Sequence, residues 1–325
     1  MSGAGRTGAP RHLAASRTMC VGDVARIGAA EAHDLLCHLR WGDQGGPSCP
    51  RCRSNFITEI YGRQVFRCRE CRYDFSVTSG TMLQSSRLPT SILLESAFLF
   101  ATARKGISSM QMADWLGIGQ KTVWLQLHRF REAMAMHQLG LTLSGIVELD
   151  AVFFKGARRR LNTGRRDPPE YRPDIPMKAA LTLIQRGGPV IAIPVTGETR
   201  KEVLAAVRQF VAPGSTIMTD EAPAYDFLRL YFELWRINHS IRYADGKKST
   251  NNAESFHARI RRSQRGNYHR MSSGADLDLY LCEAAFRHTY QYLDTRSVWE
   301  KLISLVLRQP VSRFVGYWQR SGAVA

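Results

Sequence analysis

The sequence has no run of about 18 or more apolar residues, although 44% of its 325 residues are hydrophobic. A chain without such a run is not expected to cross a membrane as a helix. The N-terminal residues include basic side chains but no continuous apolar stretch, which argues against a signal peptide. We interpret residues 1–28 as a disordered tail and 311–325 as a second tail, and we expect a cytoplasmic protein.

Acidic residues are scarce, with 28 Asp and Glu against 45 Lys and Arg, which gives a formal net charge of +17. A field of this sign favours a polyanionic partner, and nucleic acid is the first candidate. An anionic membrane surface fits less well, because the basic residues are spread over several segments and do not form one amphipathic stripe.

Cysteine is also sparse, and the seven residues are an odd number. Four of them form two CxxC pairs separated by 15 residues: Cys49, Cys52, Cys68 and Cys71. This spacing is typical of a four-cysteine zinc site, and it favours zinc over two unrelated pairs or a redox dithiol. Four thiolates close the coordination shell, so the zinc is expected to be structural. We place the ribbon in a domain over 29–80 that begins with a helix, because residues 29–41 have helical spacing.

The segment 81–140 contains "ISSMQMADWLGIGQKTVWLQLHRFREAM", which has the pattern of two helices joined by a glycine turn. The second helix would offer Gln120, Lys121 and Thr122 at its N-terminal end, where recognition helices meet base edges. An ordinary helical hairpin would show the same pattern. The basic composition and the adjacent ribbon favour a helix-turn-helix-like DNA-binding segment.

From residue 145 the pattern becomes strand-like. Three apolar strands are followed by a helix, a strand ending at Asp220, a helix over 221–232, a strand over 237–243 and a helix starting near Asn251. Residues 275–307 have helical spacing again. This order predicts an α/β fold with a mixed sheet and helices packed on it.

Three acids stand out in this region: Asp150 in the first strand, Asp220 at the end of a later strand, and Glu254 early in a basic helix. Each alone has an ordinary explanation, since Asp220 could cap a helix and Glu254 could pair with Arg259 or His257. Glu148 competes with Asp150, because residues two apart in a strand face the same side. Three converging carboxylates would suit Mg²⁺, and two such ions can serve phosphodiester chemistry.

Several of these motifs together resemble a known family. They are "CPRC…CREC", "ELDAVFFKG", "TDEAPAY" and "TNNAESFHARIRRSQRGNYHRMS", and the similarity covers about residues 29 to 293. The chain resembles the ISXO-like group of bacterial insertion-sequence transposases, which join a zinc ribbon to an RNase H-like DDE domain. The resemblance therefore implies an RNase H-like catalytic domain, here placed over 141–310.

The resemblance assigns Asp150, Asp220 and Glu254 as the acids that bind two Mg²⁺ (or Mn²⁺) ions. Asn251 is a secondary candidate at the third position, and His269 is a weaker one. One departure is that Ala151 stands where an acidic residue commonly follows the first Asp. The implied activity is metal-dependent cleavage of DNA at the element's ends and strand transfer into target DNA, by a homo-oligomer bound to DNA.

Basic residues near these acids are candidates for DNA contact. Residues 155–178 contain eight Lys or Arg against three acids. The residues that we expect to contact the DNA backbone in this part of the chain are Arg158, Arg159, Arg160, Lys247, Lys248, Arg261 and Arg262.

Two other functions remain open from the sequence. One is a non-catalytic DNA-binding regulator that uses the same ribbon and helix-turn-helix. The other is an RNase H-like nuclease without strand transfer. The intact acid triple argues against a regulator, because acids in DNA-facing segments repel phosphate.

Overall fold

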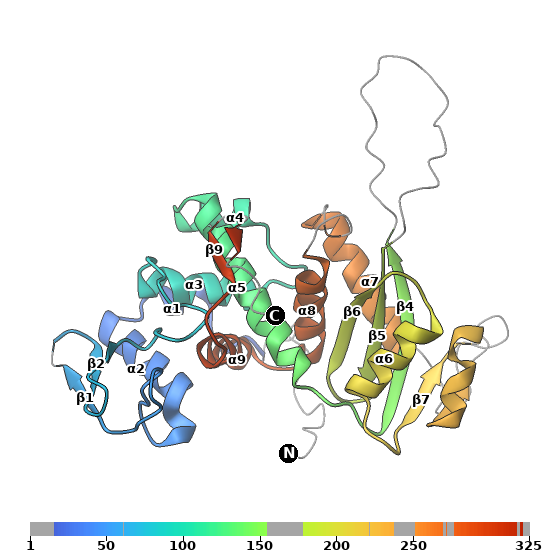
Figure 1. Cartoon of the computed structure of the whole chain (residues 1–325). Coiled ribbons are helices and arrows are strands. Elements are labelled where there is room, and N and C mark those ends of the chain that lie inside the picture. Colours follow the sequence, from blue (N-terminus) through green and yellow to red (C-terminus); the bar gives the residue numbers. More distant parts are fainter. Residues whose placement is uncertain are drawn as a thin grey trace, which may run out of the picture. The chain divides into compact units, whose positions relative to one another are not determined.

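The computed structural model describes residues 16–60, 62–154, 178–220, 222–236, 251–268, 271, 276–316 and 319–320. The chain forms two compact units (Figure 1). We call the one within Gly140–Thr289 the sheet unit and the one within Gly8–Leu139 and Tyr290–Ala325 the helical unit. Each is described by itself.

A five-stranded mixed sheet forms the centre of the sheet unit, as predicted. Its strands are β4 (Ile146–Phe154), β5 (Lys178–Gln185), β6 (Val190–Val195), β7 (Thr216–Thr219) and β8 (Glu233–Arg236). Their order across the sheet is β6-β5-β4-β7-β8. The β4–β5 and β5–β6 pairs are antiparallel, whereas β7 runs parallel to both β4 and β8. This arrangement confirms the predicted fold class.

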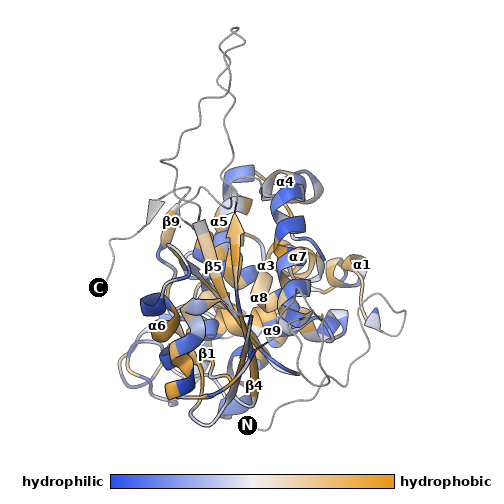
Figure 2. Cartoon of the chain, turned by 90° about the vertical axis from the view of Figure 1, so that its right-hand side faces the viewer, coloured by the Kyte–Doolittle hydropathy of each residue, from blue (hydrophilic) through white to orange (hydrophobic). Residues whose placement is uncertain are grey.

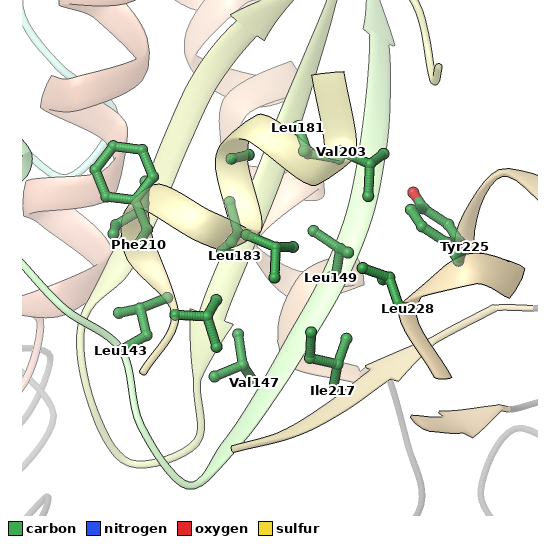
Figure 3. Packing of buried hydrophobic residues seen from close by; sticks show 14 of the residues in the cluster. Leu143, Val147, Leu149, Leu181, Leu183, Val203, Phe210, Ile217, Tyr225 and Leu228 are labelled. Carbon is green, nitrogen blue, oxygen red and sulfur yellow. The ribbon is translucent and has the colours of Figure 1, made fainter. Parts of the chain in front are cut away.

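The two faces of the sheet are covered by different helices because side chains alternate along each strand. Odd-numbered residues of β4, such as Leu149, pack against α6 (Arg200–Phe210) and the 3₁₀ helix η3 (Pro223–Leu230), as Figure 3 shows. Even-numbered residues, such as Val152, pack against α7 (Asn251–Gly266) and α8 (Leu277–Thr289). Any polar even-numbered side chain of β4 is therefore directed to the α7 side.

The last described strand of the sheet begins before the strand that was predicted at this point. β8 is formed by Glu233–Arg236, whereas the predicted strand over 237–243 lies outside the described residues. The segment before it, expected to be a helix over 221–232, is helical only at Pro223–Leu230 and has 3₁₀ geometry. The apolar "YF" at its end had extended the helical pattern, but Glu233 and the residues after it pair with β7.

The helical unit begins with α2 (Ala29–Trp41), whose bounds match the predicted segment, and continues into a three-stranded ribbon. The ribbon strands are β1 (Ile57–Ile60), β2 (Val65–Cys68) and β3 (Asp74–Phe75). Phe66 and Phe75 are buried beside Trp41, with ring centroids 5.4 and 6.3 Å from the Trp41 ring. This small aromatic core joins the ribbon to α2.

Four further helices complete the core of this unit: α3 (Thr90–Thr102), α4 (Ser109–Leu116), α5 (Gln120–Leu139) and α9 (Thr295–Arg308). α9 packs against α2, α3 and α5, and the buried Trp299 donates a hydrogen bond from Nε1 to the Leu94 carbonyl at 3.0 Å. We had placed residues up to 310 in the catalytic segment. The structure groups α9 with the helical unit, so the compact sheet unit ends at Thr289.

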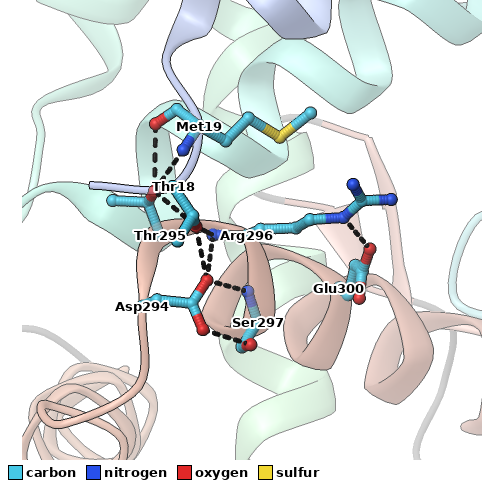
Figure 4. A network of polar contacts seen from close by, with 7 residues as sticks. All are labelled: Thr18, Met19, Asp294, Thr295, Arg296, Ser297 and Glu300. Atoms are coloured by element: carbon cyan, nitrogen blue, oxygen red, sulfur yellow. Dashed lines mark hydrogen bonds and ion pairs between the residues drawn. The ribbon is translucent and has the colours of Figure 1, made fainter. Parts of the chain in front are cut away.

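Part of each predicted tail has a defined structure. α1 (Val21–Ala25) buries Val24, and β9 (Phe314–Gly316) pairs with β10 (Gln319–Arg320) and buries Phe314. Thr18 and Met19 bind the start of α9 through Asp294 and Thr295, as Figure 4 shows. These side-chain partners are distant in sequence, which is why composition alone suggested a tail.

The hydropathy of the chain follows this architecture. In Figure 2 the strands of the sheet are coloured largely as hydrophobic, while α6 changes between hydrophobic and hydrophilic along its length. That alternation matches its buried residues Val203, Ala206, Val207 and Phe210, which lie three to four positions apart. Within the described part of the chain, no helix is long and apolar enough to cross a membrane.

Candidate active site

Asp150 lies within β4 with its side chain 24% exposed, on the side of the sheet that α7 covers. Its Oδ1 atom accepts a hydrogen bond from the Ala151 N–H at 2.8 Å. Burial, together with the nearby carboxylates of Asp220, Glu198 and Glu254, raises the pKa of Asp150 to about 7. Four acids therefore influence one another electrostatically, as expected at a site that binds cations.

Strand pairing brings Asp220 beside Asp150. In the parallel β4–β7 pair, Glu148 is opposite Met218, so a register continued by two residues places Asp150 opposite Asp220. Asp220 follows the end of β7, and its Oδ1 accepts a hydrogen bond from the Ala222 N–H at 3.0 Å. The helix-capping explanation is thus realised in part, since Ala222 is the N-cap residue of η3. The second carboxylate oxygen has no capping contact among the described residues.

Glu254 is an exposed residue of the first turn of α7. The start of α7 is fixed to β4, because the N–H groups of Asn252 and Ala253 donate to Glu148. Glu254 follows Asn252 by two residues, and Asp150 follows Glu148 by two residues. The contact between Asn252 and Glu148 therefore holds the two acids near each other. The three predicted acids thus come from two neighbouring strands and one helix of the sheet unit.

Glu148, the competitor of Asp150, has a different role. It is 0% exposed, and both carboxylate oxygens accept hydrogen bonds: Oε1 from Arg186 Nε and Asn252 Nδ2, each at 2.8 Å, and Oε2 from the two backbone N–H groups of α7. Because both oxygens of this carboxylate already accept hydrogen bonds within the protein, its role is structural. Asp150 is therefore the better candidate for metal binding.

His257 lies beside Asp150, whereas the sequence offered it as a partner of Glu254. Thr182 Oγ1 donates to the Asp150 carbonyl at 2.8 Å, so it accepts from His257 Nε2, also at 2.8 Å. This assignment leaves Nδ1 unprotonated, 3.5 Å from Asp150 Oδ2. Burial, helped by the charge of Arg261, lowers the pKa of His257 to about 4. The imidazole is thus neutral near pH 7 and supplies no cation to Asp150.

Glu198 is a fourth acid that the sequence analysis missed. It precedes Thr199, the N-cap residue of α6, and burial and Asp220 raise its pKa against the opposing effect of a contact with Tyr225. Tyr225 is fully buried, and its hydroxyl lies at the edge of the core cluster in Figure 3. Burial and Glu198 raise the pKa of Tyr225. The sequence "GETRKE" was interpreted only as a helix start, and nothing local marks Glu198 as a site residue.

The acids are an open group in this structure. Among the described residues, the four cysteines are the one set of three or more possible ligands whose atoms all lie within 4.8 Å of one another. Ligands of a single Mg²⁺ at about 2.1 Å cannot be more than ~4.2 Å apart. The carboxylate oxygens fit a hard divalent cation by their chemistry, and placing three of them on a single ion would require side-chain rotation that draws them together.

The cysteine cluster has the geometry of a tetrahedral zinc site. Sγ of Cys49 lies 3.6 Å from Sγ of Cys71, and Sγ of Cys52 lies 3.5 Å from Sγ of Cys68. Zn–S bonds of about 2.3 Å give a tetrahedral edge of ~3.8 Å. A backbone N–H of Cys71, aided by other donors, lowers the pKa of Cys68 to about 7, which favours the thiolate form that binds metal. The four residues therefore fit a closed, structural zinc site.

In the predicted helix-turn-helix, α4 and α5 are joined by a turn with Gly117 at φ +64°, but most of α5 is buried within the helical unit. Lys121 and Thr122 are exposed at its start, whereas Gln120 donates from Nε2 to Ser109 Oγ at 2.9 Å. The N-terminal end of α5 is thus exposed at Lys121 and Thr122, and its C-terminal end is exposed at Met136 and Leu139. Gln120 is partly engaged in holding α4 to α5.

Of the expected DNA contacts near the acids, Arg261 and Arg262 are exposed on α7. The main chain of Asn251 begins α7, but its side chain lies outside what the structure describes, as do the remaining candidates. Those remaining candidates are Arg158, Arg159, Arg160, Lys247, Lys248 and His269.

Comparisons with known proteins agree with this geometry. A family model described as "ISXO2-like transposase domain" matches residues 142–289, and one described as "Transposase zinc-ribbon domain" matches residues 29–74. The first spans the described acids and the second spans all four cysteines. Together the two matches cover more than half of the chain. No curated protein matches it.

Among solved structures, similarity is recorded to a Mos1 transposase paired-end complex with left transposon end, at 12% identity over 62% of this chain and 75% of that chain, with a TM-score of 0.19. A Mos1 strand transfer complex is 14% identical over 61% and 72% of the two chains, with a TM-score of 0.20. Such scores do not support a common arrangement. On the two family matches and the residues that they cover, the chain belongs to the ISXO2-like family of transposases.

Proposed function

We propose that this chain is an active DDE transposase that binds the ends of an insertion sequence, cleaves the DNA there and joins the freed ends to target DNA. The observation that carries the proposal is the convergence of Asp150, Asp220 and Glu254 in the sheet unit, where their charges raise the pKa of Asp150. A mostly buried carboxylate that lies near other carboxylates is unfavourable unless a cation is bound during function.

The acids would hold Mg²⁺ or Mn²⁺, which when bound supplies charge neutralisation and activates an oxygen nucleophile for in-line displacement at phosphorus. The role of this chain's residues is to hold three carboxylates on rigid elements, with β4 and β7 paired directly and α7 anchored to β4. Glu198 is a fourth carboxylate in position to take part. Cleavage and strand transfer are both displacements at phosphorus, so one site can serve both.

DNA would be held by basic residues around the acids. Arg261 and Arg262 are exposed on the same helix as Glu254, seven and eight residues after it. Their side chains would contact backbone phosphates next to the reacting bond, as would Arg158, Arg159, Arg160, Lys247 and Lys248. In the helical unit, the zinc ribbon and the exposed start of α5 at Lys121 would recognise the element's ends. Bringing two ends together requires more than one copy, so we infer a homo-oligomer on DNA.

A non-catalytic DNA-binding regulator is the second candidate function, and the buried Glu148 network argues against it. A regulator has no use for a fully buried carboxylate that fixes one acidic residue near two others, since burying and pairing such a charge contributes little to stability. A nuclease without strand transfer would share the acid site and differ only in its products.

The proposal is tested by incubating the purified full-length chain and Mg²⁺ or Mn²⁺ with labelled DNA taken from both flanks of its coding sequence. Asp220→Asn removes the charge but keeps an acceptor for the Ala222 N–H, so folding is expected to persist. We expect a loss of activity of at least ~10²-fold, because several kcal/mol of transition-state stabilisation are removed. Asp226→Asn serves as the matched control, because Asp226 is a partly exposed acid of η3 that pairs with Arg229 and Arg236.

Wild-type activity that survives in Asp220→Asn would exclude the mechanism. Binding of flanking DNA with no cleavage under any metal condition would favour the regulator. Cleaved ends that never appear joined to a second DNA would favour the nuclease.

A further inference from the structure

Glu148 connects two elements that lie far apart in the sequence. Its Oε2 atom accepts hydrogen bonds from the backbone N–H groups of Asn252 at 3.1 Å and Ala253 at 3.2 Å, and its Oε1 accepts from Asn252 Nδ2 at 2.8 Å. These donors belong to the first turn of α7. A helix leaves its first four N–H groups without intrahelical partners, and a carboxylate there also interacts favourably with the helix dipole. Glu148 thus caps α7 from another element.

The carboxylate is itself fixed. Arg186 Nε donates to Glu148 Oε1 at 2.8 Å, and the backbone N–H of Arg186 donates to the Ile146 carbonyl at 2.9 Å. Glu148 is 0% exposed, so rotation away from these partners would leave a buried charge unpaired. The start of α7 therefore has one favourable position along β4.

The two ends of this connection are each adjacent to a proposed metal ligand. Asp150 follows Glu148 by two residues and has its side chain on the same face of the sheet. Glu254 follows Asn252 by two residues in the same helical turn. A shift of the first turn of α7 would thus move Glu254 relative to Asp150, whereas the β4–β7 pairing that places Asp220 would not change.

We infer that Glu148 is a positioning residue for the acid site: by capping α7 through Asn252 and Ala253, it sets the distance between Glu254 and Asp150. This inference rests on the proposed function. It does not place Glu148 on the metal or the substrate. Its contribution is the placement of one ligand relative to two others.

The test uses Glu148→Gln, which keeps the side-chain shape but places an amide against the donors of α7. Asn252→Ala is the milder second variant, since it removes only the Nδ2 bond and leaves no unpaired charge. Glu283→Gln is the matched control. Glu283 is also buried, and its described partners, Arg287 and Tyr268, lie outside the first turn of α7.

Three quantities are measured on the full chain: hydrogen exchange of peptides covering 251–260, the Mn²⁺ dissociation constant without DNA, and the metal dependence of DNA cleavage. We expect faster exchange at the start of α7 and a 10- to 100-fold weaker Mn²⁺ affinity in Glu148→Gln, the range for lost supporting contacts. The KM for DNA should stay unchanged while activity is regained at high metal concentration. Asn252→Ala should change the same quantities less, and Glu283→Gln should not change them.

Unchanged exchange at 251–260, or faster exchange with wild-type Mn²⁺ affinity, would overturn the positioning role. So would an equal loss of affinity in Glu283→Gln. If Glu148→Gln does not fold, wild-type affinity in Asn252→Ala overturns the inference and weaker affinity supports it. If the wild-type chain binds no Mn²⁺, the proposed function is overturned as well. The same holds if Asp150→Asn binds Mn²⁺ as tightly as the wild type. Binding that needs Asp150 but not Glu148 overturns the positioning role alone.

Discussion

Nδ1 of His257 lies 3.5 Å from Oδ2 of Asp150, and the shared contact with Thr182 leaves that nitrogen without a proton. The imidazole ring beside Asp150 is therefore neutral, and the other close groups include three carboxylates. Ionised Asp150 is destabilised in the metal-free protein. A bound cation would remove that destabilisation.

Asp150→Asn is accordingly expected to stabilise the metal-free protein at pH 8. The pKa of Asp150 rises from 3.8 to about 7 on folding, so its contribution favours the folded state below pH ~4 and is lost as pH rises through about 7. The advantage of the variant should grow between those values and level off above pH 7, at up to ~4 kcal/mol. Urea unfolding at several pH values measures it, and His257 is common to both proteins.

Mg²⁺ provides the control for this prediction. Millimolar Mg²⁺ should raise the free energy of unfolding of the wild type at pH 8 and have little effect on Asp150→Asn, because only the wild type gains ligand binding. An advantage of the variant that is equal at pH 4 and pH 8 would contradict the electrostatic explanation.

Glu198→Gln should raise the Mg²⁺ concentration needed for half-maximal DNA cleavage by about 10- to 100-fold, a smaller effect than Asp220→Asn. The reason is that Glu198 acts on Asp150 and Asp220 by its charge. A titration of cleavage rate against metal concentration checks this, with Glu233→Gln on the exposed start of β8 as control.

A second-site variant sharpens the test of Glu198. Ala151 packs on the α6 and η3 side of the sheet, the side on which Glu198 precedes α6 and Tyr225 lies in η3. Ala151→Glu, which restores the acid common in the family at this position, should lower the metal requirement of Glu198→Gln. Wild-type metal dependence in Glu198→Gln alone would show that this acid has no part in the site.

One zinc ion per chain is expected, and Cys52→Ser should reduce zinc content as measured by elemental analysis. Since structural zinc contributes on the order of 10–16 kcal/mol to small domains, peptides covering 49–75 should lose protection from hydrogen exchange. Peptides covering 178–195, in β5 and β6, should not change. Binding of flanking DNA should weaken even though Asp150, Asp220 and Glu254 are intact. Full protection of 49–75 after zinc removal would contradict a metal-dependent ribbon.

Asp294→Ala should destabilise the helical unit by about 1 kcal/mol, because Asp294 is the N-cap of α9 and accepts from the Arg296 and Ser297 N–H groups. Burial alone would raise its pKa, but hydrogen bonds from Ser297 and Thr18 lower the pKa to about 2. A lowered acid pKa stabilises the folded state above pH ~4, and this is lost as pH falls through about 2. The difference from wild type should shrink over that window. Ser304→Ala, which removes a hydrogen bond from α9 to the Leu39 carbonyl, should not show this pH dependence.

The sequence predicted most reliably what depends on neighbouring residues. The helical spacing of 29–41 gave α2 its observed bounds, and the two CxxC pairs gave the metal cluster. Asp150, Asp220 and Glu254 were proposed through motifs and the resemblance, and the β4–β7 pairing and the contact of α7 with β4 bring them into one part of the sheet unit.

Features set by distant partners were missed. Glu198 looks like any acid before a helix, and its role depends on Asp220 across the sheet unit. The structural role of Glu148 depends on Asn252, 104 residues away. Likewise, Thr18 is fixed by Asp294, so residues that appeared to be a tail are bound. Periodicity and composition contain no information on such pairs.

The parallel pairing of β4 with β7 has one more consequence. Asp150 and Asp220 are neighbours because their strands are hydrogen-bonded to each other. Their proximity does not depend on the 69 residues between them in the sequence. The tight turn at Gly187 joins the paired strands β5 and β6, so the chain could be lengthened or even cut there. Such a cut would break the polypeptide, but the β4–β7 pairing would still hold the two carboxylates beside each other.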